Sequence, residues 1–283
     1  MLGSAAALAA DQRPGRERQV LVSAALSSGA PATGLSVADF VVREDGLSRE
    51  ITKVSPAPPP SHVLLLVDDS QAAEPSIPFL RAGLAAFIKK VAASEPAPQI
   101  GLMTFGDRPT KRADFSPTAA AVEQAAGKIF ATPGSGAYFL QAVMDGCADL
   151  RKKSAASPVI VAFVAEAGPE FSSVTHNQVA DSLKSCGASL WVIALQSAGQ
   201  VDQTREAYER ASVTGDVTRD SGGLTRALLS NQALQSAYDA VATLIMTRYQ
   251  VTYAHPDQTI PPTALEVTSK RADVKLASTR WIR

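Results

Sequence analysis

Apolar and polar residues change their spacing twice along this chain of 283 residues. Between residues 19 and 55, apolar residues alternate with polar ones over short segments, which is typical of strands with one buried face. From His62 to about residue 246, continuous apolar runs alternate with segments whose apolar residues recur at helical spacing. After Arg248 the alternating pattern returns. The pattern predicts β-strands at both ends of the chain and an α/β region between them.

The first terminal segment predicts short antiparallel strands. A strand is expected from Gln19 to Leu26, and a hairpin is expected around Asp45-Gly46, a dipeptide typical of tight turns. Beyond residue 247, the sequences RYQVTYA, TALEVTS and ADVKLAS predict three further strands. Because chain ends often lie close together, we expect the strands of both ends to pack as one small β-sandwich.

The middle of the chain predicts a sheet of mostly parallel strands covered by helices. Strands are expected in HVLLLV, QIGLMTF, PVIVAFVA and SLWVIAL, with a short edge strand in KRADF. The wholly apolar PVIVAFVA should be central. Ser116 and Pro117 resemble an N-cap followed by proline at the first helical position. Helices are expected near residues 77–91, 117–129, 138–152, 174–186, 203–212 and 224–246.

These elements predict a domain organisation of four segments. Residues 1–18 form a leader, 19–55 an N-terminal β segment, 62–246 a doubly wound α/β domain, and 247–283 a C-terminal β segment packed with 19–55. The proline-rich stretch between the first β segment and the α/β domain is predicted to be a stiff linker, because prolines fix φ and lack an N–H donor.

The leader is open to two interpretations. Ala7-Leu8-Ala9 resembles the cleavage site of an export signal, but the basic region that normally precedes the apolar stretch is missing. The alternatives are the remnant of an export signal, which would place the protein in the periplasm or outside the cell, and a disordered leader. No segment has about 18 uninterrupted apolar residues, so insertion into a membrane is not expected.

Charge and cysteine content narrow the function further. Lys plus Arg and Asp plus Glu both number 27, so the chain has no basic field for nucleic acid. Cys147 and Cys186 show no zinc-ligand spacing. Each lies on an apolar helical stripe, which favours two small buried side chains over a disulfide.

Three polar loops are expected at one edge of the predicted sheet. They are the segment Asp68–Ala72 after the first strand, GSGAYF before a helix, and AEAGPE after the PVIVAFV strand. Ligands of open parallel sheets bind at the carboxyl ends of the strands, near the point where the strand order reverses. This edge is therefore the candidate site.

The successive sequences LLLVDDS, IGLMTFGDRP, PVIVAFVAEAG and SLWVIAL resemble the von Willebrand factor type A domain. The flanking GLSVADFVVREDG and RYQVTYAHP resemble bacterial proteins related to that family, so the resemblance covers most of the chain from Gln19 onward. It implies a Rossmann-like α/β fold. It also implies a metal-ion-dependent adhesion site, in which oxygen ligands hold Mg²⁺ or Mn²⁺ and leave one position open for a partner's carboxylate.

The family's metal site uses an Asp-x-Ser-x-Ser loop, a Thr from a second loop and an Asp from a third. By this resemblance Asp68 and Ser70 match the first two ligands, and Glu166 matches the last Asp with one more methylene. The second Ser falls on Ala72 and the Thr on Ala137, which have no oxygen to offer. We therefore expect a degenerate site with no required cofactor and, at most, weak binding of Mg²⁺ or Mn²⁺.

Other loop residues are candidates for contact with a protein partner: Asp69, Ser135, Tyr138, Glu170 and Phe171. Ser135 would reach the metal position if its loop shifted. Asp69, Glu74 and Glu170 are interpreted as solvated loop acids, and the alternative is that they offer other oxygens to a metal ion. Phe105 and Phe139 are expected to be buried.

Three functions follow from these residues. The favoured one is a non-enzymatic module that binds an unknown protein partner through the loops without relying on metal. The second is a Mg²⁺- or Mn²⁺-dependent ligand-binding module. The third is an enzyme that uses Asp68 and Glu166 as an acid pair. The chain has no nucleophile elbow and no phosphate-binding glycine loop, which disfavours the third.

Overall fold

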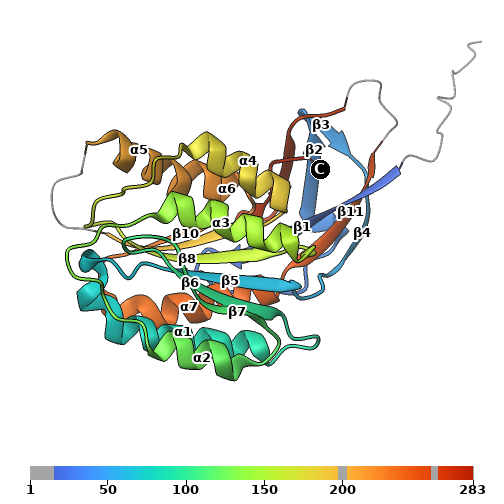
Figure 1. Cartoon of the computed structure of the whole chain (residues 1–283). Helices are drawn as coiled ribbons and strands as arrows, with labels where there is room; N and C mark the ends of the chain where they lie inside the picture. Colours follow the sequence, from blue (N-terminus) through green and yellow to red (C-terminus); the bar gives the residue numbers. More distant parts are fainter. Residues whose placement is uncertain (1–15, 197–202, 256–260, 283) are drawn as a thin grey trace, which may run out of the picture.

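The computed structural model describes residues 16–196, 203–255 and 261–282. Most of the predicted leader, residues 1–15, lies outside the described residues, and the first strand begins three residues earlier than expected, at Arg16. The described part of the chain forms a helix-covered central sheet and, beside it, two smaller antiparallel sheets (Figure 1).

The central sheet has six strands in the order β10-β9-β8-β5-β6-β7. All neighbours pair in parallel except β7, which runs antiparallel along one edge. Every residue of β5 and β8 is buried, which is why these strands read as unbroken apolar runs. The strands are β5 (His62–Val67), β6 (Gln99–Thr104), β7 (Thr110–Ser116), β8 (Val159–Ala165), β9 (Ser189–Leu195) and β10 (Thr225–Leu228).

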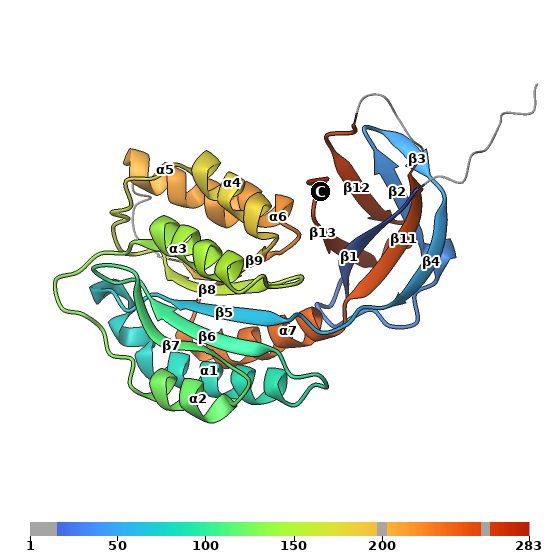
Figure 2. The same ribbon diagram turned by 45° about the vertical axis from the view of Figure 1, so that its right-hand side comes forward.

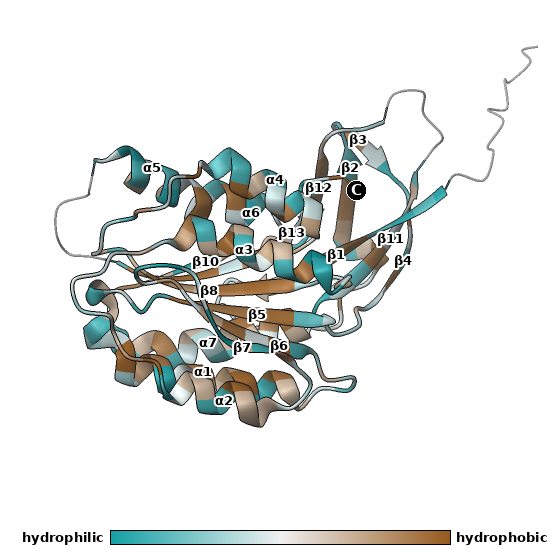
Figure 3. Ribbon diagram, in the orientation of Figure 1, coloured by the Kyte–Doolittle hydropathy of each residue, from teal (hydrophilic) through white to brown (hydrophobic). Residues whose placement is uncertain are grey.

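Helices cover both faces of this sheet. One apolar core holds side chains of α1 (Ile77–Ala92), α2 (Ala119–Gly127) and α7 (Leu234–Met246). The core on the opposite face holds side chains of α3 (Phe139–Lys152) and α4 (His176–Cys186), and α5 (Arg205–Ser212) and α6 (Thr218–Asp220) lie on the same side (Figure 1). Figure 3 shows the apolar residues gathered on the central strands and on the inner helix faces. Short 3₁₀ helices lie at Val37–Asp39, Gln71–Ser76 and Asn231–Ala233, and a π-helix lies at Val213–Val217.

The two ends of the chain build a β-sandwich, as predicted. One sheet has the order β13-β1-β11-β4 and the other β12-β2-β3, so both sheets combine N-terminal and C-terminal strands (Figure 2). The inner faces of both sheets supply a separate apolar core. The strands are β1 (Arg16–Leu26), β2 (Phe40–Glu44), β3 (Leu47–Arg49), β4 (Ile51–Pro56), β11 (Tyr249–His255), β12 (Leu265–Ser269) and β13 (Val274–Ser278).

Turn and cap chemistry explains several element ends. The hairpin between β2 and β3 turns at Asp45 (φ 47°) and Gly46 (φ 81°), both in the left-handed region that this type of turn requires. Gly187 ends α4 in the left-handed conformation, as predicted. The predicted N-cap Ser116 was wrong: Ser116 ends β7, and Thr118 occupies the N-cap position of α2.

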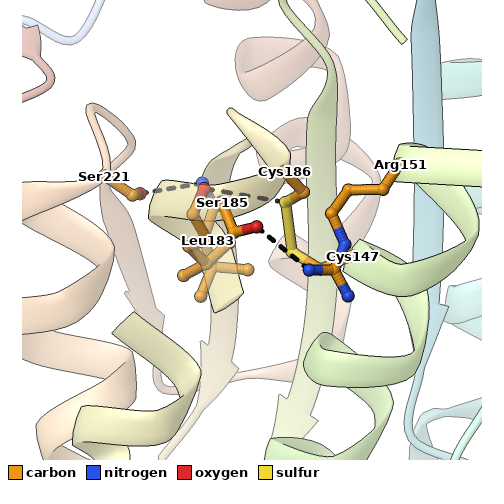
Figure 4. Close-up of a disulfide and its surroundings, with 7 residues drawn as sticks. Cys147, Arg151, Leu183, Ser185, Cys186 and Ser221 are labelled. Atoms are coloured by element: carbon orange, nitrogen blue, oxygen red, sulfur yellow. Dashed lines mark hydrogen bonds between the residues drawn. A yellow bond between two sulfur atoms is a disulfide. The ribbon is translucent and has the colours of Figure 1, made fainter. Parts of the chain in front are cut away.

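The cysteine prediction was also wrong. Cys147 in α3 and Cys186 at the end of α4 form a disulfide, with their Cα atoms 5.4 Å apart (Figure 4). The two apolar stripes do pack against each other, and both cysteines are buried there. Beside the disulfide, Arg151 donates a hydrogen bond to the Ser185 hydroxyl (3.0 Å), so the two helices are held by a covalent and a polar contact.

Within the described residues, every helix is too short or too polar to cross a membrane.

Candidate functional site

The three predicted loops meet at the carboxyl ends of β5 and β8, where the strand order reverses. Asp68 follows β5, and Glu166 follows the neighbouring strand β8. The third loop, residues 134–138, precedes α3 and pairs with its neighbours through isolated bridges at Ala137. We call the surface formed by residues 68–72, 134–138 and 166–172 the tip face.

Asp68 holds two of these elements together from inside. Its side chain is fully buried. One carboxylate oxygen accepts from the backbone N–H of Ser70 (2.9 Å), and the other accepts from the backbone N–H of Ala165 (3.0 Å). Burial raises the pKa of Asp68 above its usual value, because these neutral hydrogen bonds only partly replace water. The carboxylate thus binds the first loop to the end of β8.

Asp69 is fully buried, so the prediction of a solvated loop acid was wrong. Its carboxylate accepts from the backbone N–H of Gly106 (2.6 Å) and pairs with the Arg112 guanidinium (3.0 Å). Gly106 permits this approach, because a Cβ there would lie 2.5 Å from the backbone nitrogen of Ser70. Arg112 lies 43 residues away on the edge strand, so no local sequence pattern points to this pairing.

Ala137 lies where the backbones of the loops converge. Its side chain is fully buried, its N–H donates to the Pro169 carbonyl (2.9 Å), and its carbonyl accepts from the Phe171 N–H (2.7 Å). An antiparallel bridge also joins it to Gly106. Ala137, where the resemblance places the family's Thr, is therefore a junction of three backbone segments.

Glu170 is also buried, which corrects its interpretation as a solvated acid. Its carboxylate accepts from the backbone N–H of Phe139 (3.3 Å) and of Ser172 (3.1 Å). Phe139 is the first residue of α3, and the N-cap Tyr138 makes no side-chain cap, so Glu170 caps this helix from another loop. Burial raises the pKa of Glu170 despite these hydrogen bonds. Glu74, by contrast, is exposed as expected.

Glu166 is partly buried, and burial raises its pKa while the charge of Arg210 opposes the shift. Arg210 is buried and donates to two carbonyls of this loop, those of Gly168 (2.6 Å) and Glu166 (3.1 Å). The guanidinium thus holds the backbone of the loop. Its place on α5, 44 residues downstream, could not be inferred from the sequence pattern.

The tip face offers few oxygen ligands to a cation. Ala72 and Ala137 present methyl groups, and both oxygens of Asp68 already accept backbone N–H groups. The Ser70 hydroxyl is buried and has no hydrogen-bond partner among the described residues. No group of three or more His, Cys, Asp or Glu side chains able to hold a metal occurs in the described part of the chain. Mg²⁺ requires six oxygens at near-octahedral positions, so these side chains leave most of its coordination to water.

One exposed aromatic ring of the tip face lies close to a second, half-buried one. Phe171 is 51% exposed, and its ring centre lies 6.0 Å from that of the half-buried Tyr138. Gly136 lies beneath the Phe171 ring, because a Cβ on this glycine would be 2.4 Å from it. Phe130, which the sequence analysis missed, is 68% exposed, with the Arg81 guanidinium 4.3 Å from its ring centre.

The remaining candidates have internal roles. Phe105 and Phe139 are fully buried, as predicted, with ring centres 5.6 Å apart. The Ser135 hydroxyl donates to the Thr132 carbonyl within its own loop (2.8 Å), and its backbone carbonyl accepts from the N–H of Gln71. Its hydroxyl therefore stabilises the turn of this loop.

Comparison with known proteins identifies the fold. No family model and no curated protein sequence matches the chain. Among solved structures, a von Willebrand factor type A protein from Catenulispora acidiphila aligns with a TM-score of 0.50 and 10% identity over 89% of this chain and 76% of its own.

Two pilus proteins align similarly. The von Willebrand factor domain of the type V pili tip protein Mfa5 from Porphyromonas gingivalis gives a TM-score of 0.50 at 12% identity, over 67% of this chain and 96% of its own. The pilus adhesin SpaC from Lactobacillus rhamnosus GG gives 0.51 at 10% identity, over 85% of this chain and 47% of its own. The α/β region of the chain has the von Willebrand factor type A fold.

Proposed function

We propose that this protein is a non-enzymatic module that binds a protein partner through the tip face without a bound metal ion. Solved structures with the same fold include a pilus adhesin and a pilus tip protein, which supports a role in protein recognition. The observation that carries the proposal is the use of the tip-face acids. The buried carboxylates of Asp68, Asp69 and Glu170 all accept hydrogen bonds from backbone N–H groups, so they stabilise the loops instead of facing outward.

The tip face offers a partner apolar area in place of charge. The exposed Phe171 and the half-buried Tyr138 form an aromatic pair over a loop that backbone hydrogen bonds hold at Ala137. Aromatic residues on a rigid support are typical of the central contacts of protein interfaces. The metal-ion-dependent adhesion site is then degenerate, with Ala72 and Ala137 in place of two hydroxyl ligands.

One observation favours the second candidate, a Mg²⁺- or Mn²⁺-dependent module. The Ser70 hydroxyl is buried and makes no hydrogen bond of normal geometry to any residue that the structure describes, and a buried hydroxyl without a hydrogen bond costs about 1–3 kcal/mol. A weakly held hydrated cation would satisfy it, together with Asp68 and Glu166. An enzyme that uses Asp68 is disfavoured, because both oxygens of this carboxylate are engaged by backbone N–H groups.

The proposed location is outside the cytoplasm. The disulfide between α3 and α4 supports it, because disulfides persist mainly in oxidising compartments such as the periplasm and the extracellular space. The pilus proteins of similar fold support the same location. We also propose the domain boundaries expected from the sequence, with an α/β domain at 62–246 between two β segments.

Site-specific photo-crosslinking tests the tip face directly. A benzophenone amino acid replaces Phe171 in the full chain, and the matched control replaces Leu47, which is 61% exposed on the sandwich hairpin. Crosslinking is carried out with extract of the source cells, with EDTA or with added Mg²⁺. We expect one defined crosslinked partner from position 171 in both conditions and none from position 47.

Two outcomes contradict the proposal. If crosslinking at position 171 disappears in EDTA and returns with Mg²⁺, the metal-dependent module is correct. If position 171 gives no defined product while position 47 does, the binding surface lies on the sandwich.

A further inference from the structure

A second candidate site lies at the opposite end of the central sheet. A cavity of about 240 Å³ opens between the sandwich and the amino ends of β8 and β9. It is lined by residues of β1 and β11 on one side and by Pro158 and Ser189 on the other, with Trp281 and Ile282 from the end of the chain. Figure 2 shows this junction, where the C-terminal segment runs between the two parts. We call this cavity the junction cleft.

The Arg248 side chain of the junction cleft has two nitrogen atoms without a hydrogen-bond partner among the described residues. It lies in the connection between α7 and β11, and it is only 6% exposed. Its Nε and Nη2 atoms are both buried, and neither has a hydrogen-bond partner in the described part of the chain. A buried guanidinium without partners is costly, and most such groups in proteins are paired.

The two unpaired nitrogens form one edge of the guanidinium. Their N–H groups point in the same direction, and this spacing matches the two oxygens of a carboxylate. The same edge is used in this way elsewhere in the chain: Nε and Nη2 of Arg271 donate to the two oxygens of Asp273, at 3.1 and 2.7 Å. The free edge of Arg248 is therefore suited to a bidentate oxyanion.

The junction cleft contains one positive charge, that of Arg248, without an acidic partner among the described residues. Arg18 and Arg248 are its only charged residues among the described lining, and none is acidic. Arg18 lies 3.4 Å from Glu44, which balances its charge, whereas Arg248 forms no ion pair among the described residues. Burial lowers the pKa of Arg248 to about 10, so the group stays charged at neutral pH. Water can accept its hydrogen bonds but brings no counter-charge.

The walls of the junction cleft limit what accompanies the anion. Val20, Leu265, Trp281 and Ile282 line it with apolar surface beside Arg248. We propose that the junction cleft binds a carboxylate carried on a small apolar body, with both oxygens held by Nε and Nη2 of Arg248. The source is either a free carboxylic acid or the terminal carboxylate of a peptide. This site is independent of the tip face, so either proposal stands if the other fails.

Titration of the full chain with hexanoate tests the carboxylate, and hexanamide is its neutral counterpart. The readout is the Nε–H NMR signal of Arg248, identified by its loss in Arg248→Lys. We expect hexanoate to shift this signal saturably, with a Kd at or below about 1 mM, and hexanamide to leave it unchanged. Equal binding of hexanoate and hexanamide overturns the proposal. A saturable shift with neither hexanoate nor a short apolar peptide that has a free C-terminus also overturns it. The titration itself uses the unmodified protein, and the Arg248→Lys variant serves only to assign the signal.

Two variants then test by calorimetry whether the Nε and Nη2 edge of Arg248 holds the carboxylate. Arg248→Gln removes the charge, and Arg248→Lys keeps the charge without the bidentate edge. Both are expected to weaken hexanoate binding at least about tenfold, because a bidentate charged pair is lost. Arg108→Gln is the control, since Arg108 is exposed near the carboxyl end of β6. Unchanged binding in Arg248→Lys, or an equal loss in Arg108→Gln, contradicts the assignment.

A third arm identifies the source of the carboxylate. A short apolar peptide is titrated with a free C-terminus and with an amidated one. Stronger binding of the free peptide than of hexanoate indicates a peptide terminus as ligand, and the reverse order indicates a small acid. Binding of the amidated peptide as tightly as the free one would contradict recognition of a carboxylate.

Discussion

Two buried carboxylates, one in each part of the molecule, are held in opposite ways. Asp68 at the tip face and Glu44 in the sandwich are both fully buried. Asp68 accepts from the neutral backbone N–H groups of Ser70 and Ala165, and its pKa is raised, mainly by burial. For Glu44 burial also acts to raise the pKa, but hydrogen bonds from charged and phenolic partners outweigh it, and the pKa is lowered.

The partners of Glu44 explain what its charge does. Glu44 ends β2 and accepts from Arg49 (2.8 Å) and Tyr253 (3.1 Å), and it contacts His255 Nδ1 (2.8 Å) and Arg18 (3.4 Å). Tyr253 and His255 belong to β11 in the other sheet, so the carboxylate joins the two sheets. A buried acid in this chain therefore need not be a binding site, because Asp68 stabilises loops and Glu44 joins sheets.

Removal of the Glu44 charge should cause the largest loss of stability. Glu44→Gln leaves two arginines without their counter-charge in a buried network, which typically costs about 3–5 kcal/mol. Urea unfolding at neutral pH measures the loss. Glu50→Gln is the matched control, because Glu50 is an exposed neighbour in sequence. A loss no larger than that of the control would show that the network does not hold the two sheets together.

Asp68→Asn should have a smaller effect. The amide keeps one acceptor but turns an NH₂ group toward a backbone donor, so the expected loss is about 1–3 kcal/mol. The free energy of unfolding is compared in EDTA and in Mg²⁺, and the loss should be the same in both. Asp107→Asn, in an exposed position of the next loop, is the control. A loss that appears only with Mg²⁺ would show that Asp68 serves a metal ion.

Arg112→Gln should cost less still. The guanidinium is 44% exposed, so solvent weakens its pairing with Asp69, and we expect a loss of about 1 kcal/mol. Thermal unfolding compares it with Arg108→Gln, a change of the same charge at an exposed site. If the two variants melt at the same temperature, Asp69 is held by the backbone of Gly106 alone.

The opposite pKa shifts predict opposite pH dependences, the smallest of the expected effects. The lowered pKa of Glu44 gives stability that is present above its unfolded value and lost as pH falls through its folded value. The raised pKa of Asp68 means that the folded state binds the proton more tightly than the unfolded state. The free energy of unfolding of the wild type should therefore rise relative to that of Asp68→Asn as pH falls from neutral toward 3.8. Unfolding from neutral pH to about pH 3 measures both differences, and equal slopes for the Glu44 and Asp68 variants would contradict these opposite pH dependences.

The fold could be predicted largely from the sequence, because burial dictates pattern. The strands β5, β8 and β9 are sequestered between two helix layers, so they appear as apolar runs. One strand, β10, was predicted as the start of a helix. Leu224 and Leu228 have helical spacing, but pairing of this segment with β9 decides its conformation, and that contact is distant in sequence.

The meeting of the candidate loops was predicted, but the structural roles of their acids were not. Asp68, Ser70 and the loops of Ala137 and Glu170 do meet at the predicted edge. Burial of Asp69 and Glu170 was not foreseen, because their partners are backbone groups and an arginine from distant segments. The disulfide was missed for a similar reason: each cysteine fits an apolar stripe, and only the packing of α3 on α4 brings the two together.

The most direct test of metal-independent recognition is a calorimetric titration of the EDTA-treated protein with Mg²⁺ and Mn²⁺. An Ala72→Ser/Ala137→Thr variant, which restores the two missing hydroxyl groups, is titrated alongside, and circular dichroism confirms that it folds. Our account predicts no saturable heat for the wild type and saturable binding for the variant. Saturable binding to the wild type with a Kd below about 1 mM, or about 4 kcal/mol of binding free energy, would contradict it and make the metal-dependent module the correct function.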